Sequence, residues 1–322
     1  MKLIYQVLFF CFLSTQIFAQ QKDTLVNKLD SLGIKADTAG QKNIINPKAY
    51  TKPARISFST YFVLVGDDLK QDVVAPFHQT GRQWTHIVLY AASVAAFSVG
   101  LDEPIQRTAS DFRNDSKTLS SISSYVTNFG GKYEVYSLVA LGSYGFLSHN
   151  YKLQTTTLLA TQAYITSGLL ETGLKYLTGR QRPGYVYTNH TEPEPTFHGI
   201  GYSLGHNIYN HKISTAFPSG HTTVIFAAAT VFAQEYKDVK WVPIVAYSAA
   251  SLVGLSRITQ NAHWASDVIV GATLGYLCGR QVVNNYHRYA KLKSPNKSGT
   301  LSFNLNYNGN NFEPGLIYKF TR

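Results

Sequence analysis

Three short polar segments interrupt an otherwise apolar region of this chain: KYLTGRQRP at 175–183, FPSGHT at 217–222 and SRITQNAHWASD at 256–267. Between them they supply cations, imidazoles, a hydroxyl, a glycine and a carboxylate. The residues concerned are Lys175, Arg182, Arg257, His221, His263, Ser219, Gly220 and Asp267. Such a set suits a site that binds a tetrahedral oxyanion while a histidine attacks it.

The spacing within the first segment suggests how its cations are presented. Lys175 and Arg182 are seven residues apart, about two helical turns, so a continuous helix would place both on one face. Pro183 would then end that helix, because proline has no N–H to donate.

The other two segments also match helix positions. Ser219 and Gly220 precede an apolar run at 222–232, which predicts a helix N-terminus whose free N–H groups and dipole favour an anion. His263 and Asp267 are four residues apart and would be neighbours on a helix. The carboxylate is therefore expected to orient an imidazole.

The three segments resemble the signature of the type 2 phosphatidic acid phosphatase (PAP2) family, which is related to bacterial acid phosphatases and vanadium haloperoxidases. The family pattern is K-x6-RP, then PSGH, then SR-x5-H-x3-D, and every fixed position is filled here in the same order. The resemblance covers residues 85–285. The six-residue gap between Lys175 and Arg182 resembles the phosphatases rather than the haloperoxidases.

The resemblance implies a phosphoryl transfer in two steps, without a metal or another cofactor. His263 would be the nucleophile that forms a phosphohistidine, with Asp267 orienting it. His221 would protonate the leaving oxygen and then activate a water. The implied phosphate-binding residues are Lys175, Arg182, Ser219, Gly220 and Arg257.

The apolar pattern predicts an all-α fold. Helices are expected at 84–101, 132–149, 154–178, 220–236, 241–256 and 264–285, with a shorter helical piece between 103 and 126. The polar segments then fall at the end of the third helix, the start of the fourth and the turn into the sixth. All three would meet at one end of a six-helix bundle.

The rest of the chain is divided by composition. Residues 1–19 read as a secretory signal, with an uncleaved anchor helix as the alternative. Residues 20–80 form a polar lead with a strand expected at 56–65. Residues 81–288 would be the bundle. Residues 289–322 read as a linker and a β-hairpin, because apolar and polar residues alternate on both sides of Asn308 and Gly309.

Charge and hydropathy indicate the partners. The net charge of +11 suits phosphorylated substrates or an acidic membrane surface. Nucleic acid is disfavoured, because no basic run is interleaved with aromatic residues. The first apolar run is near the minimum length of a membrane span. We expect export to the periplasm and association with a membrane; an integral membrane protein is the alternative.

The histidines of the loop at 184–216, which are His190, His198, His206 and His211, match no standard zinc spacing. A lid or a substrate-recognition loop is therefore favoured there. Glu171, one turn before Lys175, is expected to form an ion pair with it. Cys278 is expected to be an inert core residue.

The function expected from these observations is hydrolysis of a phosphomonoester or diphosphate of an envelope lipid. A periplasmic acid phosphatase acting on small soluble esters is the main alternative. A vanadate-dependent haloperoxidase and an inactive envelope-binding protein are more remote. The sequence does not indicate the oligomeric state.

Overall fold

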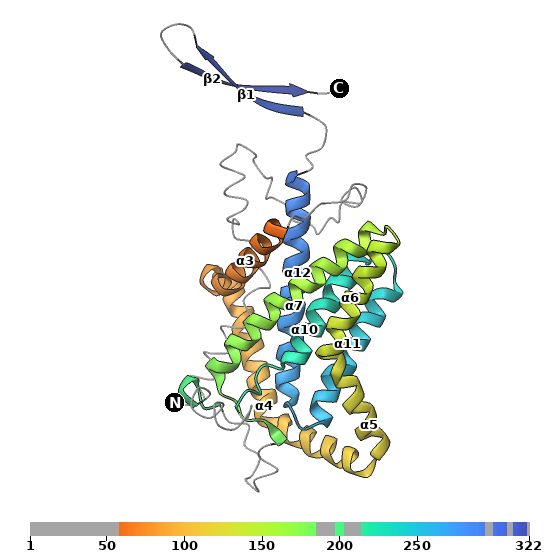
Figure 1. Cartoon of the computed structure of the whole chain (residues 1–322). Helices are drawn as coiled ribbons and strands as arrows, with labels where there is room; N and C mark the ends of the chain where they lie inside the picture. The colour runs from red at the N-terminus through yellow and green to blue at the C-terminus, as the bar shows by residue number, and fades with distance from the viewer. Residues whose placement is uncertain (1–57, 185–196, 203–213, 294–298, 308–311, 321–322) are drawn as a thin grey trace.

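The computed structural model describes residues 58–184, 197–202, 214–293, 299–307 and 312–320. These residues are mostly helical (Figure 1), as the expected all-α class requires. In chain order the helices are α3 Phe58–Val74, α4 Gly81–Asp115, α5 Lys117–Val126, α6 Lys132–Leu147, α7 Tyr151–Thr178, α10 Gly220–Glu235, α11 Trp241–Thr259 and α12 Ala265–Lys293. Two short 3-10 helices are η3 (Ala75–His78) and η4 (Thr127–Gly130).

Each of the six predicted helical ranges falls on one of these helices: α4, α6, α7, α10, α11 and α12. Helix α5 occupies the region where a shorter helical piece was expected. Helix α3 was not predicted. The described residues therefore contain more helices than the predicted count of six, and that count is not confirmed.

The predicted strand at 56–65 is wrong from residue 58 onwards, because these residues belong to α3. Leu64, Asp68 and Asp72 are all buried, and their four-residue spacing is helical. The hydroxyl group of Tyr61 lies 3.1 Å from Thr161 Oγ1 on α7. The aromatic and β-branched residues at 58–65 have a local preference for a strand. Packing against α7 and α12 outweighs this preference and stabilises a helix.

Side chains at the helix termini explain several boundaries. Thr80 and Gln83 form a capping box at the start of α4. Asn150 caps α7 by accepting a hydrogen bond from the Leu153 amide at 3.0 Å. Helix α7 ends where Gly179 adopts φ of 57°, a left-handed conformation in which glycine has no steric penalty.

Helix α4 continues through Pro104 to residue 115, well beyond the predicted end at 101. Buried polar contacts on both sides of the proline hold it to the bundle. Asp102 pairs with Arg180 at 2.6 Å, and Gln106 donates to the Ile258 carbonyl at 3.0 Å. These tertiary contacts outweigh the loss of one helical hydrogen bond at the proline.

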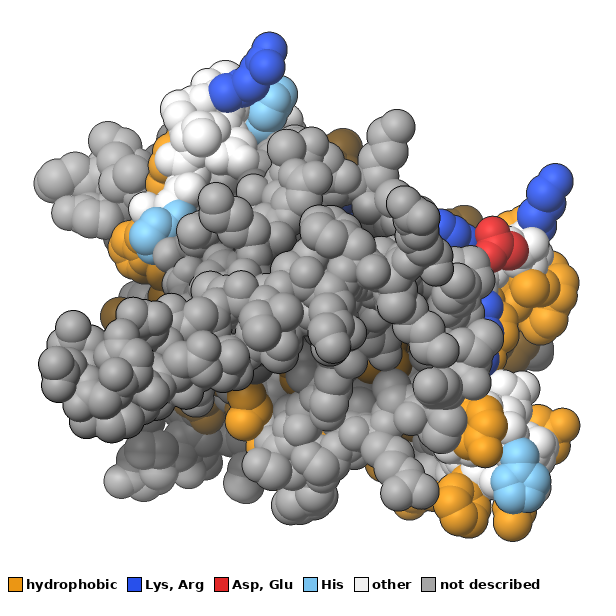
Figure 2. Space-filling model, turned by 90° about the horizontal axis from the view of Figure 1, so that it is seen from above, with side chains coloured by type: hydrophobic (Ala, Val, Ile, Leu, Met, Phe, Trp, Pro, Cys, Tyr) orange, Lys and Arg blue, Asp and Glu red, His pale blue; other side chains and the backbone are white. Residues whose placement is uncertain are grey.

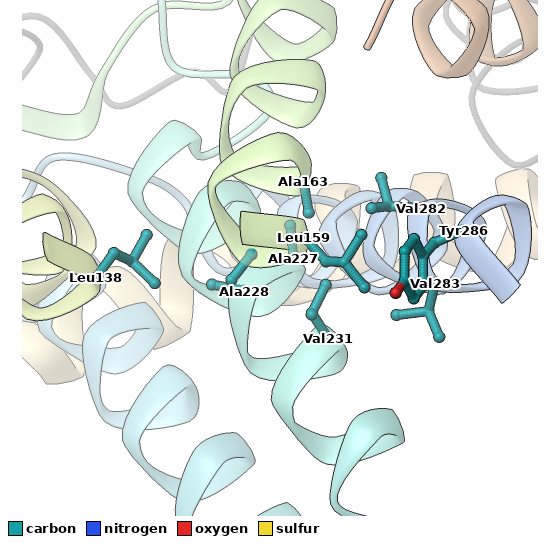
Figure 3. Packing of buried hydrophobic residues seen from close by; sticks show 10 residues of the cluster. Leu138, Leu159, Ala163, Ala227, Ala228, Val231, Val282, Val283 and Tyr286 are labelled. Atoms are coloured by element: carbon teal, nitrogen blue, oxygen red, sulfur yellow. The ribbon is translucent and has the colours of Figure 1, made fainter. Parts of the chain in front are cut away.

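One cluster of the core lies where α6, α7, α10 and α12 pack together (Figure 3). Its members are mostly small or branched: Leu138, Leu159, Ala160, Ala163, Ala227, Ala228, Val231, Val282, Val283 and Tyr286. Helices α10 and α12 approach very closely. A Cβ on Gly275 would lie 2.2 Å from the Thr223 carbonyl oxygen, so only glycine fits this crossing.

Many large apolar side chains remain exposed on the outer faces of the helices. Examples are Val99 on α4 at 74%, Phe146 on α6 at 71% and Ile244 on α11 at 67% exposed. Figure 2, a view from above Figure 1, shows hydrophobic side chains at several places around the edge of the molecule. Helices α4 and α11 are long and apolar enough to cross a membrane.

After α12 the chain forms two antiparallel strands, β1 (Gly299–Tyr307) and β2 (Phe312–Phe320). Their register pairs Gly299 with Phe320 and Tyr307 with Phe312. In Figure 1 both strands lie beyond the C-terminal end of α12. The predicted signal at 1–19, most of the polar lead and the turn at Asn308 and Gly309 lie outside the described residues. The domain boundaries stay predictions.

Candidate active site

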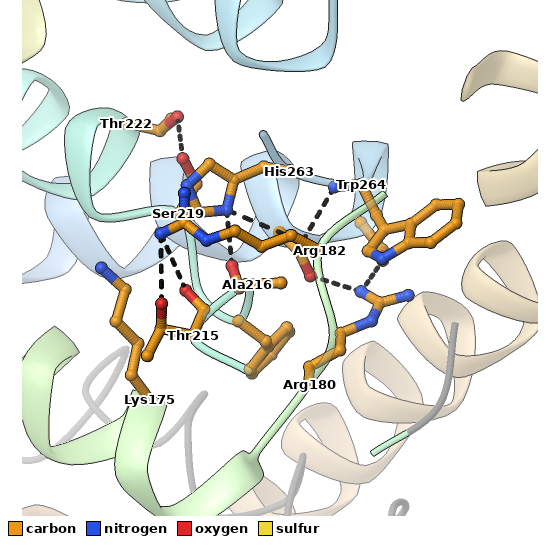
Figure 4. A network of polar contacts seen from close by, with 12 residues as sticks. Lys175, Arg180, Arg182, Thr215, Ala216, Ser219, Thr222, His263 and Trp264 are labelled. Carbon is orange, nitrogen blue, oxygen red and sulfur yellow. Dashed lines mark hydrogen bonds and ion pairs between the residues drawn. The ribbon is translucent and has the colours of Figure 1, made fainter. Parts of the chain in front are cut away.

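The three polar segments lie together in space (Figure 4). They come from the C-terminal end of α7, the N-terminus of α10 and the junction of α11 with α12. The charges of Arg182, Arg257 and Lys175 all act on the His263 imidazole. The structure therefore brings the residues of the sequence signature to one end of the bundle, around a histidine.

The predicted helical arrangement of Lys175 and Arg182 is wrong. Helix α7 ends at Thr178 because of the left-handed Gly179, so Arg182 lies in the connection that follows. Its guanidinium donates to Thr215, at 3.2 Å to Oγ1 and 3.4 Å to the carbonyl oxygen. The two cations therefore reach the site from a helix and a loop rather than from one helical face.

His263 is 1% exposed. Its Nδ1 lies 2.6 Å from the Ala216 carbonyl oxygen, which can only accept, so Nδ1 carries the proton and Nε2 has a free lone pair. Burial lowers the pKa of His263 well below its usual range, and the charges of Arg182 and Arg257 lower it further. The imidazole is therefore neutral and has a lone pair on Nε2, as a nucleophile requires.

Asp267 and His263 do not share a helical surface, because α12 begins at Ala265. His263 Nδ1 lies 3.8 Å from Asp267 Oδ2, which accepts the Trp264 amide at 2.8 Å. The nearest hydrogen-bond partner of Nδ1 is the Ala216 carbonyl. The role of Asp267 in orienting His263 stays a prediction.

Arg180 was not identified from the sequence, yet it is fully buried beside the site. Its guanidinium pairs with Asp102 on α4 and with Asp267 on α12. It also donates to Ser98 at 2.9 Å and to Ser266 at 2.7 Å. This network ties α4 to the residues that follow His263.

Asp102 and Asp267 share one arginine, and this affects the pKa of Asp267. Burial raises the pKa of Asp267 to about 7, although the charge of Arg180 opposes the shift. The Asp102 carboxylate raises it further. One sequence signal pointed to the network: Asp102 is an acid in the apolar stretch of α4, and such a residue needs a partner if it is buried.

His221 opens α10 and lies against η4. A Cβ on Gly131 would be 3.4 Å from His221 Nε2, and one on Gly130 would be 2.8 Å from His221 Cβ. From the same short helix, Thr127 accepts a hydrogen bond from Arg257 Nη1 at 2.6 Å. Sequence reasoning did not identify η4 as part of the site, because no local motif marks it.

Ser219 and Gly220 occupy the N-terminus of α10 as predicted, but Ser219 does not cap it with its side chain. Ser219 Oγ is paired with Thr222 Oγ1 at 2.8 Å, and the Ser219 amide donates to the Asp267 carbonyl at 3.1 Å. A Cβ on Gly220 would lie 2.7 Å from Lys175 Nζ. Glycine therefore lets the ammonium reach the helix N-terminus.

Lys175 also pairs with Glu171 at 2.7 Å, which confirms the expected ion pair. Cys278 is 1% exposed, in agreement with a core role.

Of the loop histidines, His198 is described, whereas His190, His206 and His211 lie outside the described residues. Within the described part of the chain, no three His, Cys, Asp or Glu side chains gather as metal ligands would.

Residues 156–291 match the PAP2 superfamily, and this range contains all three polar segments. This match agrees with the family resemblance that the sequence signature indicated.

Curated relatives agree over shorter stretches. A lipid A 1-phosphatase from Porphyromonas gingivalis is 44% identical over 24% of this chain and 18% of its own length. A lipid A 1-phosphatase from Rhizobium johnstonii is 32% identical over 34% of this chain and 40% of its own. The chain thus matches less than half the length of these relatives.

A solved structure of a transmembrane PAP2-type phosphatidylglycerolphosphate phosphatase from Bacillus subtilis is 20% identical. The alignment covers 72% of this chain and 94% of that one, with a TM-score of 0.41.

Proposed function

We propose that this protein is a phosphatase that hydrolyses a phosphomonoester or diphosphate of an envelope lipid through a phosphohistidine. The observation that carries the proposal is the His263 imidazole. It is buried, its Nδ1 is committed to the Ala216 carbonyl at 2.6 Å, and three cations surround it. A buried, neutral imidazole with a lone pair on Nε2, close enough to three cations for their charges to lower its pKa, is the arrangement that attack on a phosphoryl group needs.

The roles of the other residues follow from their positions. Lys175, Arg182 and Arg257 neutralise the phosphoryl oxygens, and the Ser219 hydroxyl group and the Gly220 amide at the start of α10 add hydrogen bonds. His221, which lies against η4, protonates the leaving oxygen. It then takes a proton from the water that releases phosphate from His263. Asp267 orients the segment that carries His263. No step of this scheme uses a metal ion.

A lipid substrate is supported by the surface of the bundle. In the most apolar stretches of α4 and α11, only 22% and 33% of residues are buried. A soluble protein would bury these stretches, so their exposure favours contact with a membrane. The printed names of the relatives, lipid A 1-phosphatases, point to the same substrate class. We propose that residues 1–19 direct export and that the bundle sits on or in the envelope membrane.

The test measures phosphate release by the purified protein from detergent-dispersed lipid phosphomonoesters and diphosphates. A metal chelator is present throughout. We expect His263→Ala and His221→Ala each to lower turnover by about 10³-fold or more. His86→Ala, which changes an exposed histidine on α4, serves as the matched control and should retain activity. Full turnover in both site variants would refute the phosphohistidine mechanism.

A broad-specificity acid phosphatase remains the second candidate, because the same site could act on small esters. Comparing kcat/KM for a lipid phosphate with that for a water-soluble aryl phosphate separates the two. A lipid phosphatase should prefer the lipid, whereas an acid phosphatase should show no such preference. Vanadate should inhibit both, and bromide oxidation with vanadate would instead indicate a haloperoxidase.

A further inference from the structure

An aromatic cluster lies on the outer surface of α5, η4 and α6, next to the site. We call it the aromatic face, and it consists of Tyr125, Phe129, Tyr133 and Tyr136. Neighbouring rings have centroids 5.8 Å apart for Tyr125 and Phe129 and 5.4 Å apart for Phe129 and Tyr133. Tyr133 and Tyr136 follow at 6.3 Å. The rings therefore form one continuous surface.

The aromatic face is exposed where a ligand could reach it. Tyr125 is 60%, Phe129 38% and Tyr136 64% exposed. The ammonium group of Lys132 lies 5.2 Å from the centre of the Tyr133 ring. The face thus combines apolar ring surfaces with tyrosine hydroxyl groups and a cation.

The aromatic face is continuous with the site through η4. Phe129 is followed by Gly130 and Gly131, whose Cβ positions would fall 2.8 Å from His221 Cβ and 3.4 Å from His221 Nε2. Thr127, two residues before Phe129, binds Arg257. The backbone that contacts His221 therefore also carries the aromatic rings.

We propose that the aromatic face holds the leaving group of the substrate, namely the hydroxyl-bearing, acyl-linked alcohol to which the phosphate is esterified. This inference rests on the proposed function, in which His221 protonates the leaving oxygen. The atoms attached to that oxygen must then lie next to His221 Nε2, where Gly131 leaves room. The residues that flank this glycine pair in the chain, from Tyr125 to Tyr136, carry the aromatic face.

The chemistry of the aromatic face suits such a group. Rings with one apolar side and a polar tip bind ligands that are themselves amphipathic, and pockets for such ligands are commonly lined by aromatic residues. Exposed aliphatic residues on α4 and α11 could contact lipid chains equally well at any depth in a bilayer. The aromatic face differs from them by its direct continuity with His221.

The experiment uses full-length protein and three single variants of matched exposure. Tyr125→Ala and Tyr136→Ala alter the aromatic face. Tyr144→Ala removes a tyrosine that is 63% exposed on the same helix as Tyr136, but at its far end. KM and kcat are measured with a detergent-dispersed phospholipid phosphate and with an aryl phosphate. The inhibition constants of a non-hydrolysable phospholipid phosphonate and of vanadate are measured in parallel.

We expect KM for the phospholipid to rise about five- to twentyfold in Tyr125→Ala and Tyr136→Ala, equivalent to about 1–2 kcal/mol. The increase with the aryl phosphate should be at least fivefold smaller. Affinity for the phosphonate should fall as lipid KM rises, and it should fall by more than the affinity for vanadate. Tyr144→Ala should match the wild type throughout.

Three results would overturn the proposal. Lipid kinetics unchanged in both variants would show that the leaving group lies elsewhere. Equal losses with both substrates would indicate a general structural effect. Weaker binding of both variants to phosphatidylcholine vesicles, with unchanged kinetics on the detergent-dispersed lipid, would make the aromatic face a bilayer anchor. A wild type that releases no phosphate from either substrate would instead refute the proposed function, and unchanged phosphonate affinity would then refute the aromatic face separately.

Discussion

Arg180 and Asp102 form a fully buried ion pair at 2.6 Å, although they are 78 residues apart in the chain and lie on opposite sides of α5 and α6 in sequence. The same arginine also pairs with Asp267. The pair therefore connects α4, which has no residue in the sequence signature, to the helix that follows His263.

Replacing Arg180 should affect both stability and catalysis. Arg180→Gln leaves two buried carboxylates without their cation, which typically costs about 3–5 kcal/mol of stability. The His263 segment should also lose its fixed position, so kcat should fall more than KM rises. Thermal unfolding and steady-state kinetics measure the two effects.

Arg107→Gln is the matched control for Arg180→Gln. Arg107 pairs with Glu103 on α4, but both side chains are exposed, so the change should be worth at most about 0.5 kcal/mol. Equal stability of the two variants would show that the buried network contributes nothing.

The pH dependence of stability should differ in sign between His263 and Asp267. The pKa of His263 is lowered on folding, so its contribution is present at and above pH 6.5 and is lost as the pH falls through the folded-state value. The pKa of Asp267 is raised from 3.8 to about 7, so its contribution is present below pH 4 and is lost as the pH rises towards 7. In the wild type the two effects oppose each other.

Single variants should separate these two contributions. Relative to the wild type, Asp267→Asn should become more stable as the pH rises from 4.5 to 6.5. His263→Gln should become less stable over the same range. The measurement is the melting temperature of each variant at the two pH values. If the difference from the wild type changed in the same direction in both variants, the opposite contributions of His263 and Asp267 would be contradicted.

The crossing of α10 and α12 should tolerate no side chain at Gly275. The Cβ of Gly275→Ala would lie 2.2 Å from the Thr223 carbonyl oxygen, so the helices must separate, and stability should fall by about 1–3 kcal/mol or more. Gly173→Ala in α7 is the control, because nothing lies within 4 Å of its Cβ position. That variant should gain about 0.5–1 kcal/mol from helix propensity. Melting temperatures compare the two.

The hydrogen bond from Arg257 to Thr127 should matter for phosphate binding. Thr127→Val keeps the side-chain shape and removes the acceptor, and a hydrogen bond to a charged group is worth about 1.5–3 kcal/mol. We expect kcat/KM to fall about tenfold or more, with little change in stability. Thr85→Val, at an exposed threonine that bonds its own helix, is the control. Full activity in Thr127→Val would show that Arg257 does not need this partner.

Local sequence patterns predicted the parts of the site that depend on spacing. The helices that carry Lys175, His221 and Arg257 were expected from apolar periodicity, and the signature indicated the resemblance to the PAP2 superfamily that residues 156–291 match. The same local patterns failed at residues 58–65 and at Arg182. In the first case burial decided the conformation, and in the second the left-handed Gly179 ended α7 early.

The sequence by itself determined which residues of the PAP2 signature this chain carries and that they sit near the ends of apolar helices, because periodicity and motif spacing are local properties. Only the tertiary structure decided that Ala216 holds His263, that Arg180 joins Asp102 to Asp267, and that η4 lies against His221. These contacts join residues 47 to 91 positions apart, and such pairings depend on how the helices pack rather than on any neighbouring residue.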